Sequence, residues 1–269
     1  MIPYSSRGRG NRWTTAFARQ AWLGLLSFTP SCETAGRPGA QILVAAAASL
    51  SAVLPELVTA FEEESGVHVA VTTGASGQLA QQIREGAPVD VFLSADRAWV
   101  ERLAAEQRIV AGTVAVYALG RLVLFQTAES RRIRAIGDLT DPRLRRIAIA
   151  NPETAPYGRA ARQALEAAGI LAAVEARIVI AENVRQTVQY IETSGVDVAF
   201  TAEALMQPGK GTWIVVPAEL YDPIEQGLGV VANRPTESAA RAFAAFVLGP
   251  RGRDILARSG FGSPERTGS

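Results

Sequence analysis

From Gln41 onward, short apolar runs alternate with segments whose apolar residues recur at a helical period. QILVAAA and VHVAVTT have the length and pattern of strands, whereas LSAVLPELVTAFEEESG has helical spacing and ends at Gly66. SGQLAQQIREG, VDVFLSA and DRAWVERLAAEQ continue the alternation as helix, strand and helix. This order predicts a parallel β-sheet with helices on both faces.

The pattern then restarts after VAVYALGRLVLFQ, a long apolar run from Val114 to Gln126 with a glycine in its middle. A short helix is expected near Ile136 to Leu139, and RIAIAN, ARIVIAE, VDVAFTA and WIVVP read as strands separated by helices. IEQGLGVVANRP reads as a further strand, followed by two helices broken at Gly249-Pro250. We therefore expect an α/β fold of two lobes, with parallel-dominated sheets flanked by helices.

The first 40 residues do not follow this pattern. An arginine-rich start precedes the apolar run Ala21–Phe28, and a stretch rich in small residues, glycine and proline follows. That order is typical of a secretory signal, and the apolar run is too short to span a bilayer. We interpret residues 1–40 as a leader, removed or disordered, with a mis-started leader as the alternative. Cys32 is a candidate for lipid anchoring, but Thr29-Pro30-Ser31 is a poor cleavage context, which favours a spare cysteine.

Composition narrows the function classes. The chain is 48% hydrophobic and 20% charged with a net charge of +1, which fits a globular protein and argues against nucleic acid or an anionic membrane as partner. One cysteine and one histidine exclude an internal disulfide and the usual zinc ligand sets. The histidine, His68, lies in an alternating strand and is interpreted as structural. The phosphate-loop motif GxxxxGK[ST] and a GxGxxG motif after the first strand are both absent.

Four junctions at which a strand passes into a helix carry small residues or hydrogen-bond donors. They are Ala47-Ala48-Ser49-Leu50, Thr73-Gly74-Ala75-Ser76-Gly77-Gln78, Asn151-Pro152-Glu153-Thr154-Ala155-Pro156-Tyr157-Gly158 and Glu182-Asn183-Val184-Arg185. Taken singly, each is explained as well by ordinary helix capping, a tight turn or a solvated helix start, with Tyr157 as a packing residue. Taken together, they offer hydroxyl and N–H donors with few acceptors, which is the chemistry that binds an oxyanion without a cationic clamp.

The motifs also resemble those of the periplasmic molybdate-binding proteins of ABC-type uptake systems. The similar segments occur in the same order along residues 41–261: AAASL, GASGQLAQQIREGAPVDVFLSAD, NPETAPYGRAA, ENVRQTV and FVLGPRGRDILARSGF. The resemblance implies a type II periplasmic-binding-protein fold whose crossing segments lie near Val116–Leu122 and Tyr221–Gly229. The expected lobes are then 41–117 with 225–269, and 118–224.

The resemblance also implies the ligand positions. Ser49 and Ser76 would bind the anion through hydroxyl and amide, and Tyr157 and Val184 through their amides. Molybdenum would be held as molybdate, with no side chain coordinating a cation and no further cofactor. Some members place a tyrosine hydroxyl on the anion from the position that corresponds to Phe200, and a phenyl ring cannot donate that bond. No role is therefore carried over to Phe200. In this reading, the small residues before Ser49 keep the turn open for the anion.

The functional hypothesis is a periplasmic binding protein, not an enzyme, that captures molybdate or tungstate and delivers it to an ABC permease as a monomer. A receptor for sulfate or phosphate is the nearest alternative. An enzyme acting on a phosphorylated substrate would need a base or metal, and the candidates Glu153, Glu182 and Asp96 have no partner set. The sensing domain of a DNA-binding regulator would need a helix-turn-helix, and residues 1–40 are too short and lack its period.

Overall fold

The computed structural model describes residues 41–127 and 133–264, so the expected leader and Cys32 lie outside the described residues. The strands are β1 (Gln41–Ala47), β2 (His68–Gly74), β3 (Val91–Ser94), β4 (Ala115–Gly120), β5 (Leu122–Gln126), β6 (Ile147–Ala150), β7 (Ile178–Ala181), β8 (Val198–Ala202), β9 (Thr212–Val215) and β10 (Ile224–Val230). The α-helices are α1 (Leu54–Ser65), α2 (Ser76–Arg84), α3 (Arg97–Ala105), α4 (Pro156–Ala167), α5 (Leu171–Val174), α6 (Val184–Glu192), α7 (Glu237–Leu248) and α8 (Pro250–Arg258). Short 3-10 turns lie at Ala48–Leu50, Ile136–Thr140, Glu175–Arg177, Glu203–Leu205 and Ala218–Leu220.

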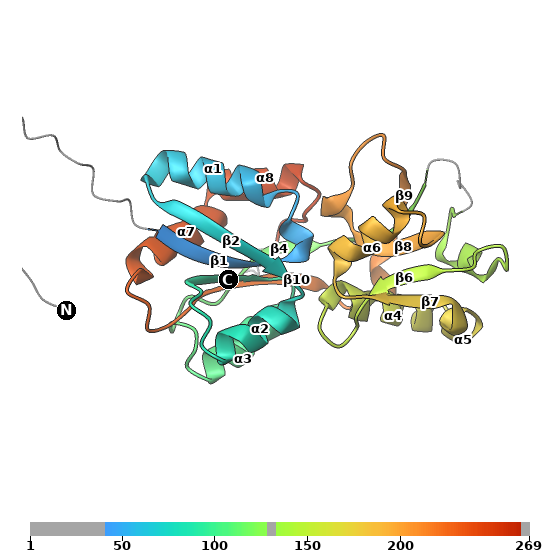
Figure 1. The fold of residues 1–269 in the computed structure, drawn as a ribbon, viewed down its shortest axis with the longest axis horizontal. Coiled ribbons are helices and arrows are strands. Elements are labelled where there is room, and N and C mark those ends of the chain that lie inside the picture. Colours follow the sequence, from blue (N-terminus) through green and yellow to red (C-terminus); the bar gives the residue numbers. More distant parts are fainter. Residues whose placement is uncertain (1–40, 128–132, 265–269) are drawn as a thin grey trace, which may run out of the picture. The chain divides into compact units, whose positions relative to one another are not determined.

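The first sheet has the strand order β2-β1-β3-β10-β4 (Figure 1). Strand β1 runs parallel to β2 and β3, whereas β10 is antiparallel to β3 and β4. Alternate residues of β1 pack on opposite faces: Ile42 and Val44 join the core under α1, α7 and α8, and Ala45 joins the core under α2 and α3. Both faces of this sheet are therefore covered, as the continuous apolar run of β1 predicts.

The second sheet has the order β7-β6-β8-β5-β9 and repeats this plan. Strand β6 is parallel to β7 and β8, and β5 is antiparallel to β8 and β9. Each sheet is thus mixed, with parallel pairing among three neighbouring strands and antiparallel pairing beyond them. We refer to the first sheet with its helices as lobe 1, and to the second sheet with α4, α5 and α6 as lobe 2.

The long apolar run divides between the two lobes. Strand β4 stays in the first sheet as far as Gly120, and β5 begins in the second sheet at Leu122. The chain returns between Val215, the end of β9, and Ile224, the start of β10. Strand β4 extends three residues beyond 117, where the sequence placed the end of lobe 1, and the division of the chain into lobes stays a prediction.

The helix after β1 starts later than expected, whereas α4 starts near Tyr157, as predicted. The helix expected from Leu50 is first a 3-10 turn over Ala48–Leu50, and α1 begins only at Leu54, with Pro55 in its first turn. Helix α4 begins at Pro156, immediately before Tyr157. Proline favours the first turn of a helix because its missing N–H has no intrahelical partner there. Both prolines thus lie in the first turns of their helices.

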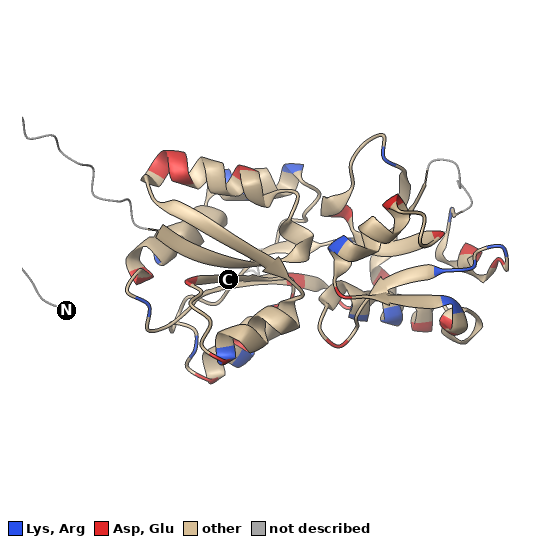
Figure 2. Ribbon diagram, viewed as in Figure 1, with Lys and Arg blue, Asp and Glu red and all other residues tan. Residues whose placement is uncertain are grey.

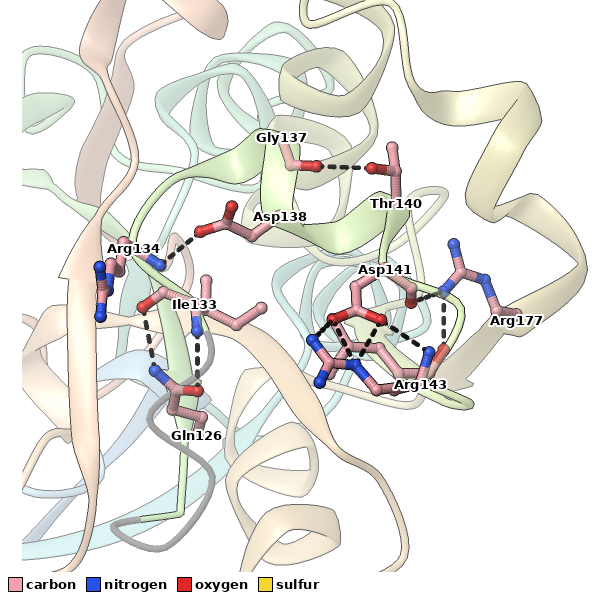
Figure 3. Close-up of polar contacts among 10 residues, drawn as sticks. Gln126, Ile133, Arg134, Gly137, Asp138, Thr140, Asp141, Arg143 and Arg177 are labelled. Atoms are coloured by element: carbon pink, nitrogen blue, oxygen red, sulfur yellow. Dashed lines mark hydrogen bonds and ion pairs between the residues drawn. The ribbon is translucent and has the colours of Figure 1, made fainter.

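Polar contacts hold residues 133–144 in lobe 2 (Figure 3). The Gln126 side chain donates to the Ile133 carbonyl and accepts from the Ile133 amide, both at 3.1 Å. The Asp138 carboxylate accepts from the amides of Arg134 and Ala135, and these bonds lower the pKa of that carboxyl. Arg177 donates to carbonyl oxygens of this segment, those of Leu139, Asp141 and Leu144. The Arg177 bonds hold this segment against the 3-10 turn Glu175–Arg177, which precedes β7.

Candidate functional site

A small cavity lies where the carboxyl ends of β1, β2 and β3 meet the amino ends of α4 and α6. It encloses about 200 Å³ of empty space, part of which opens to solvent. All four residues that the sequence singled out, Ser49, Ser76, Tyr157 and Val184, line it. Among the described residues the lining carries no charged side chain; it consists of Ala47, Ala48, Ser49, Gly74, Ala75, Ser76, Ala95, Ala155, Pro156, Tyr157, Asn183 and Val184.

Ser49 follows β1 within the short 3-10 turn. Its side chain is 1% exposed, and its hydroxyl oxygen has no hydrogen-bond partner among the described residues. Leaving a buried hydroxyl unsatisfied costs about 1–3 kcal/mol, so such a group indicates a missing partner. Ala47 and Ala48, both nearly buried, line the same cavity with no side chain beyond a methyl group. Their small size leaves the approach to the Ser49 hydroxyl open.

Ser76 is the first residue of α2. Its Oγ accepts a hydrogen bond of 2.9 Å from the Ala95 amide, so the hydroxyl proton remains to be donated. The first bond of helical span in α2 runs from the Leu79 amide to the Ala75 carbonyl. The Ser76 amide therefore lies before the first intrahelical donor, as helix starts require. Ser76 presents two donors to the cavity, a hydroxyl and an amide.

The Tyr157 amide lies in the first turn of α4, whose first bond of helical span comes from Arg159 to the Ala155 carbonyl. The loop before it is held by Asn151, whose side-chain oxygen accepts from the Glu153 amide at 2.9 Å and whose carbonyl accepts from the Ala155 amide at 2.8 Å. This loop holds the start of α4 at a fixed place. The Tyr157 amide is thus a free donor on a rigid support.

Val184 is the first residue of α6. The start of this helix has both a capping side chain, that of Asn183, and a backbone amide that the cap leaves free. The Asn183 side chain accepts from the amides of Arg185 and Gln186 at 3.0 and 3.1 Å, which leaves the Val184 amide outside the cap. The hydroxyls of Thr187 and Thr201 both donate to the Val184 carbonyl, at 2.8 and 3.0 Å. The two threonines hold Val184 in place, and no sequence motif pointed to them.

The remaining candidates lie away from the cavity. Phe200 is buried in the core of lobe 2, and Arg185 is exposed. Glu153 and Glu182 are also exposed, and neither lines the cavity. Asp96 caps α3 by accepting from the Ala98 amide. None of the three acidic candidates for an enzyme therefore faces the cavity.

Contacts between the lobes surround the cavity, and sequence patterns gave no sign of them. The Gly77 amide of α2 donates to the Thr154 carbonyl at 2.9 Å. Asp96 forms an ion pair with Arg159 of α4. The first is a backbone bond between residues far apart in sequence, so no side-chain pattern announces it. Both contacts draw lobe 1 toward lobe 2 beside the predicted donors.

Burial governs the electrostatics of the site. The Tyr157 side chain is buried, and burial raises the pKa of its hydroxyl well above the ordinary value, against smaller opposing effects of Ser49 and Gln226. The hydroxyl stays neutral throughout the pH range of ordinary solutions. The cavity is therefore a set of neutral donors with no titrating group among its described lining residues.

Three further features of the described residues are the grouping of possible metal ligands, the apolar length of the helices and the distribution of charge. In the ranges 41–127 and 133–264, no three of the residue types His, Cys, Asp and Glu gather as a metal site would need. No helix of the described chain is long and apolar enough to cross a membrane. Acidic and basic residues are interspersed along the ribbon of both lobes (Figure 2). His68 is exposed at the start of β2, 3.7 Å from the Glu62 carboxylate.

Comparisons with known proteins agree with this geometry. The chain is 32% identical to the molybdate-binding protein ModA of Azotobacter vinelandii over 83% of this chain and 90% of that protein. It is 31% identical to ModA of Rhodobacter capsulatus over 82% and 88% of the two chains. The solved periplasmic molybdate-binding protein of Azotobacter vinelandii superposes with a TM-score of 0.79 at 31% identity, covering 83% of this chain and all of that one.

These similarities confirm the resemblance that the motifs indicated and the two-lobed α/β fold. Residues 42–262 match the family described as bacterial extracellular solute-binding proteins. The match includes every residue that lines the cavity. The chain therefore belongs to the family of bacterial extracellular solute-binding proteins.

Proposed function

We propose that this protein binds molybdate, and tungstate with it, in the cavity between its lobes and delivers the anion to an ABC permease. The observation that carries the proposal is the set of uncharged donors that converge there, from Ser49 and Ser76 in lobe 1 and from Tyr157 and Val184 in lobe 2. Relatives that cover most of the chain carry the name molybdate-binding protein, which supports this choice of anion.

The donor set suits a tetrahedral dianion. Helices α2, α4 and α6 begin at the cavity, so the positive ends of their dipoles would face the anion. Each helix end contributes about 0.3–1 kcal/mol to the binding free energy, or more when it is partly buried. A hydrogen bond to a charged group contributes about 1.5–3 kcal/mol. Micromolar binding needs about 8 kcal/mol, so the two hydroxyls and three amides suffice after part of their energy offsets the cost of ordering.

Closure follows from the placement of these donors on both lobes. An anion bound to lobe 1 alone meets Ser49 and Ser76, and it reaches Tyr157 and Val184 only when the lobes approach. A ligand that makes more bonds in the closed form shifts the population toward that form. The closed, liganded monomer would then be the form that docks on the membrane permease outside the cytoplasm, with or without an anchor at Cys32.

Two alternatives use the same geometry differently. A receptor for sulfate or phosphate would need the same kind of donors, because those anions share the tetrahedral shape, so cavity size decides between them. An enzyme acting on a phosphorylated substrate would need a general base or metal. The described lining of the cavity supplies serine hydroxyls and backbone N–H groups beside small alanine side chains. These groups suit the binding of an anion rather than proton transfer.

Replacing both Ser49 and Ser76 by alanine tests the site. The double variant loses two hydroxyl donors to a charged ligand, and we expect its molybdate affinity to fall by well over tenfold. Isothermal titration calorimetry measures this directly.

Ser51→Ala is the matched control. The Ser51 hydroxyl is also buried and without a partner among the described residues, but Ser51 does not line the cavity. We expect this control to bind molybdate as the wild type does. An unchanged affinity in the double variant would contradict the assignment of the site.

A further inference from the structure

Three buried polar side chains lie beside the cavity where the chain crosses between lobes. Gln226, on β10, is fully buried, and its amide nitrogen donates to the Tyr157 hydroxyl at 3.4 Å. Its side-chain oxygen lies 3.3 Å from the Tyr117 hydroxyl, which is also 3.3 Å from the Ser94 carbonyl. Tyr117 is on β4 and Tyr157 on α4, so Gln226 joins a crossing strand of lobe 1 to the first helix of lobe 2.

This network reaches the anion donors at both of its ends. At one end, Tyr157 lines the cavity together with Ser49. At the other end, Ser94 directly precedes Ala95, whose amide donates to the Ser76 Oγ. Gln226 thus contacts Tyr157 directly, and it is linked to Ser76 through Tyr117 and the backbone of Ser94 and Ala95.

Gln226 and Tyr157 pack tightly against the backbone at Gly120. Gly120, the last residue of β4, faces both partners: a Cβ atom there would lie 2.3 Å from the Tyr157 hydroxyl oxygen and 2.7 Å from the Gln226 side-chain nitrogen. Close packing of this kind favours one arrangement of the side chains over a continuous range of them. When the lobes separate, the hydrogen bond between Gln226 and Tyr157 must break.

A buried glutamine in an apolar strand needs a reason, because an unpaired amide is costly to bury. Gln226 also lies at a register shift in the pairing of β10 with β4, between Gln226 and Gly227. Such irregularities redirect side chains. Here the redirected side chain contacts Tyr117 of its own sheet and Tyr157 of the other lobe.

We propose that Gln226 is a positioning residue that ties the closed arrangement of the lobes to the occupied anion site through the Tyr157 hydroxyl. Its bond to Tyr157 forms only when the lobes meet, so it slows opening and release of the anion. The proposal rests on the function proposed above and adds a residue that contacts no anion.

The experiment compares Tyr157→Phe, Gln226→Met and the double variant in the full-length protein. Tyr157→Phe keeps the amide donor and removes only the hydroxyl, and Gln226→Met keeps the side-chain length and removes its polar atoms. Release of radioactive molybdate into excess unlabelled molybdate gives the dissociation rate, and urea unfolding of the ligand-free protein gives stability. Tyr190→Phe is the control, because the Tyr190 hydroxyl forms no hydrogen bond with any part of the chain that the structure describes.

We expect each single variant to release molybdate about three- to tenfold faster, the effect of one hydrogen bond, and Tyr190→Phe to release it at the wild-type rate. The double variant should release it no faster than the faster single variant, because both changes remove the same link.

Wild-type release rates in both single variants would overturn the proposal, even if their stability fell, because a merely structural role moves stability alone. Additive effects in the double variant would overturn it as well. A wild-type protein that does not bind molybdate would overturn the proposed function, and with it the role given to Gln226. That failure appears in the wild type, so it is distinct from the other two.

Discussion

At the scale of single residues, the site depends on residues with a very small side chain or none. Ala47 and Ala48 carry only methyl groups beside Ser49, and the Gly77 amide meets the Thr154 carbonyl directly. The predicted anion donor Ser76 is adjacent to Gly77, and the predicted donor Tyr157 follows Thr154 closely in the chain. The backbone bond between Gly77 and Thr154 therefore sets the distance between donors of opposite lobes.

Replacing Gly77 by alanine should weaken molybdate binding at least tenfold. The new Cβ would lie 3.1 and 3.2 Å from the Thr154 Cα and carbonyl oxygen of lobe 2, so it would hold the lobes apart. It would also lie 2.9 Å from a ring carbon of Trp99 in its own lobe. Calorimetry measures the affinity, and urea unfolding the stability. We expect stability to change little, since the helical preference of alanine over glycine, about 1 kcal/mol, offsets the close contact with Trp99.

Gly137→Ala is the control for this change. A Cβ at Gly137 meets nothing within 4 Å, so binding should stay at the wild-type level. Wild-type affinity in Gly77→Ala would show that this contact does not limit how closely the lobes approach.

At the scale of elements, some backbone amides at the starts of helices bond to a capping side chain, and others remain free beside the cavity. In α6 the Asn183 side chain takes the amides of Arg185 and Gln186 and leaves that of Val184. In α2 the Ser76 oxygen is engaged by Ala95 of lobe 1 rather than by its own helix. A cap and a ligand site are therefore not competing explanations of these junctions.

Asn183→Ala should lower both stability and affinity. Loss of a capping side chain costs about 0.5–2 kcal/mol, and the freed first turn of α6 would hold the Val184 amide less firmly. We expect a few-fold loss of molybdate affinity by calorimetry and a lower midpoint in urea. Thr193→Ala, at the other end of α6, removes a hydroxyl that donates to the Gln189 carbonyl and should spare binding. Equal losses of affinity in both variants would contradict a special role for the cap.

Sequence patterns predicted the elements better than their connections. Periodicity placed β1, β2, α2 and α3 because each has one dominant spacing of apolar residues. It did not reveal that the apolar run around Gly120 divides between two sheets, because strands buried in either sheet look alike. The four predicted cavity residues carry small side chains or cap helices, which is visible locally. Gln226 and Tyr117 stood in apolar strands, and a polar residue in such a strand was the only signal of their network.

At the scale of the whole molecule, the two lobes meet through few polar contacts. Asp96 at the start of α3 pairs with Arg159 of α4, beside the backbone bond from Gly77 to Thr154. The Arg159 side chain is about half exposed and that of Asp96 mostly buried. An ion pair of this exposure is worth about 0–1 kcal/mol and weakens with salt.

Arg159→Gln should therefore reduce molybdate affinity only a few-fold at low salt, by favouring the open form. The difference from the wild type should shrink as salt is added, because salt already weakens the pair in the wild type. Titrations at low and high sodium chloride measure both effects. Arg162→Gln removes a pair within α4, with Glu166, and controls for the loss of one positive charge. A difference from wild type that stays constant with salt would argue against an electrostatic contact between lobes.

The central claim is that neutral donors from both lobes bind molybdate or tungstate. Calorimetric titration of residues 41–269 with molybdate, tungstate, sulfate and phosphate tests it most directly. We predict tight binding of the first two anions and no heat from sulfate or phosphate. Binding of sulfate or phosphate instead would keep an oxyanion receptor and contradict molybdate as its ligand. No heat with any of the four anions would contradict the account of the site itself.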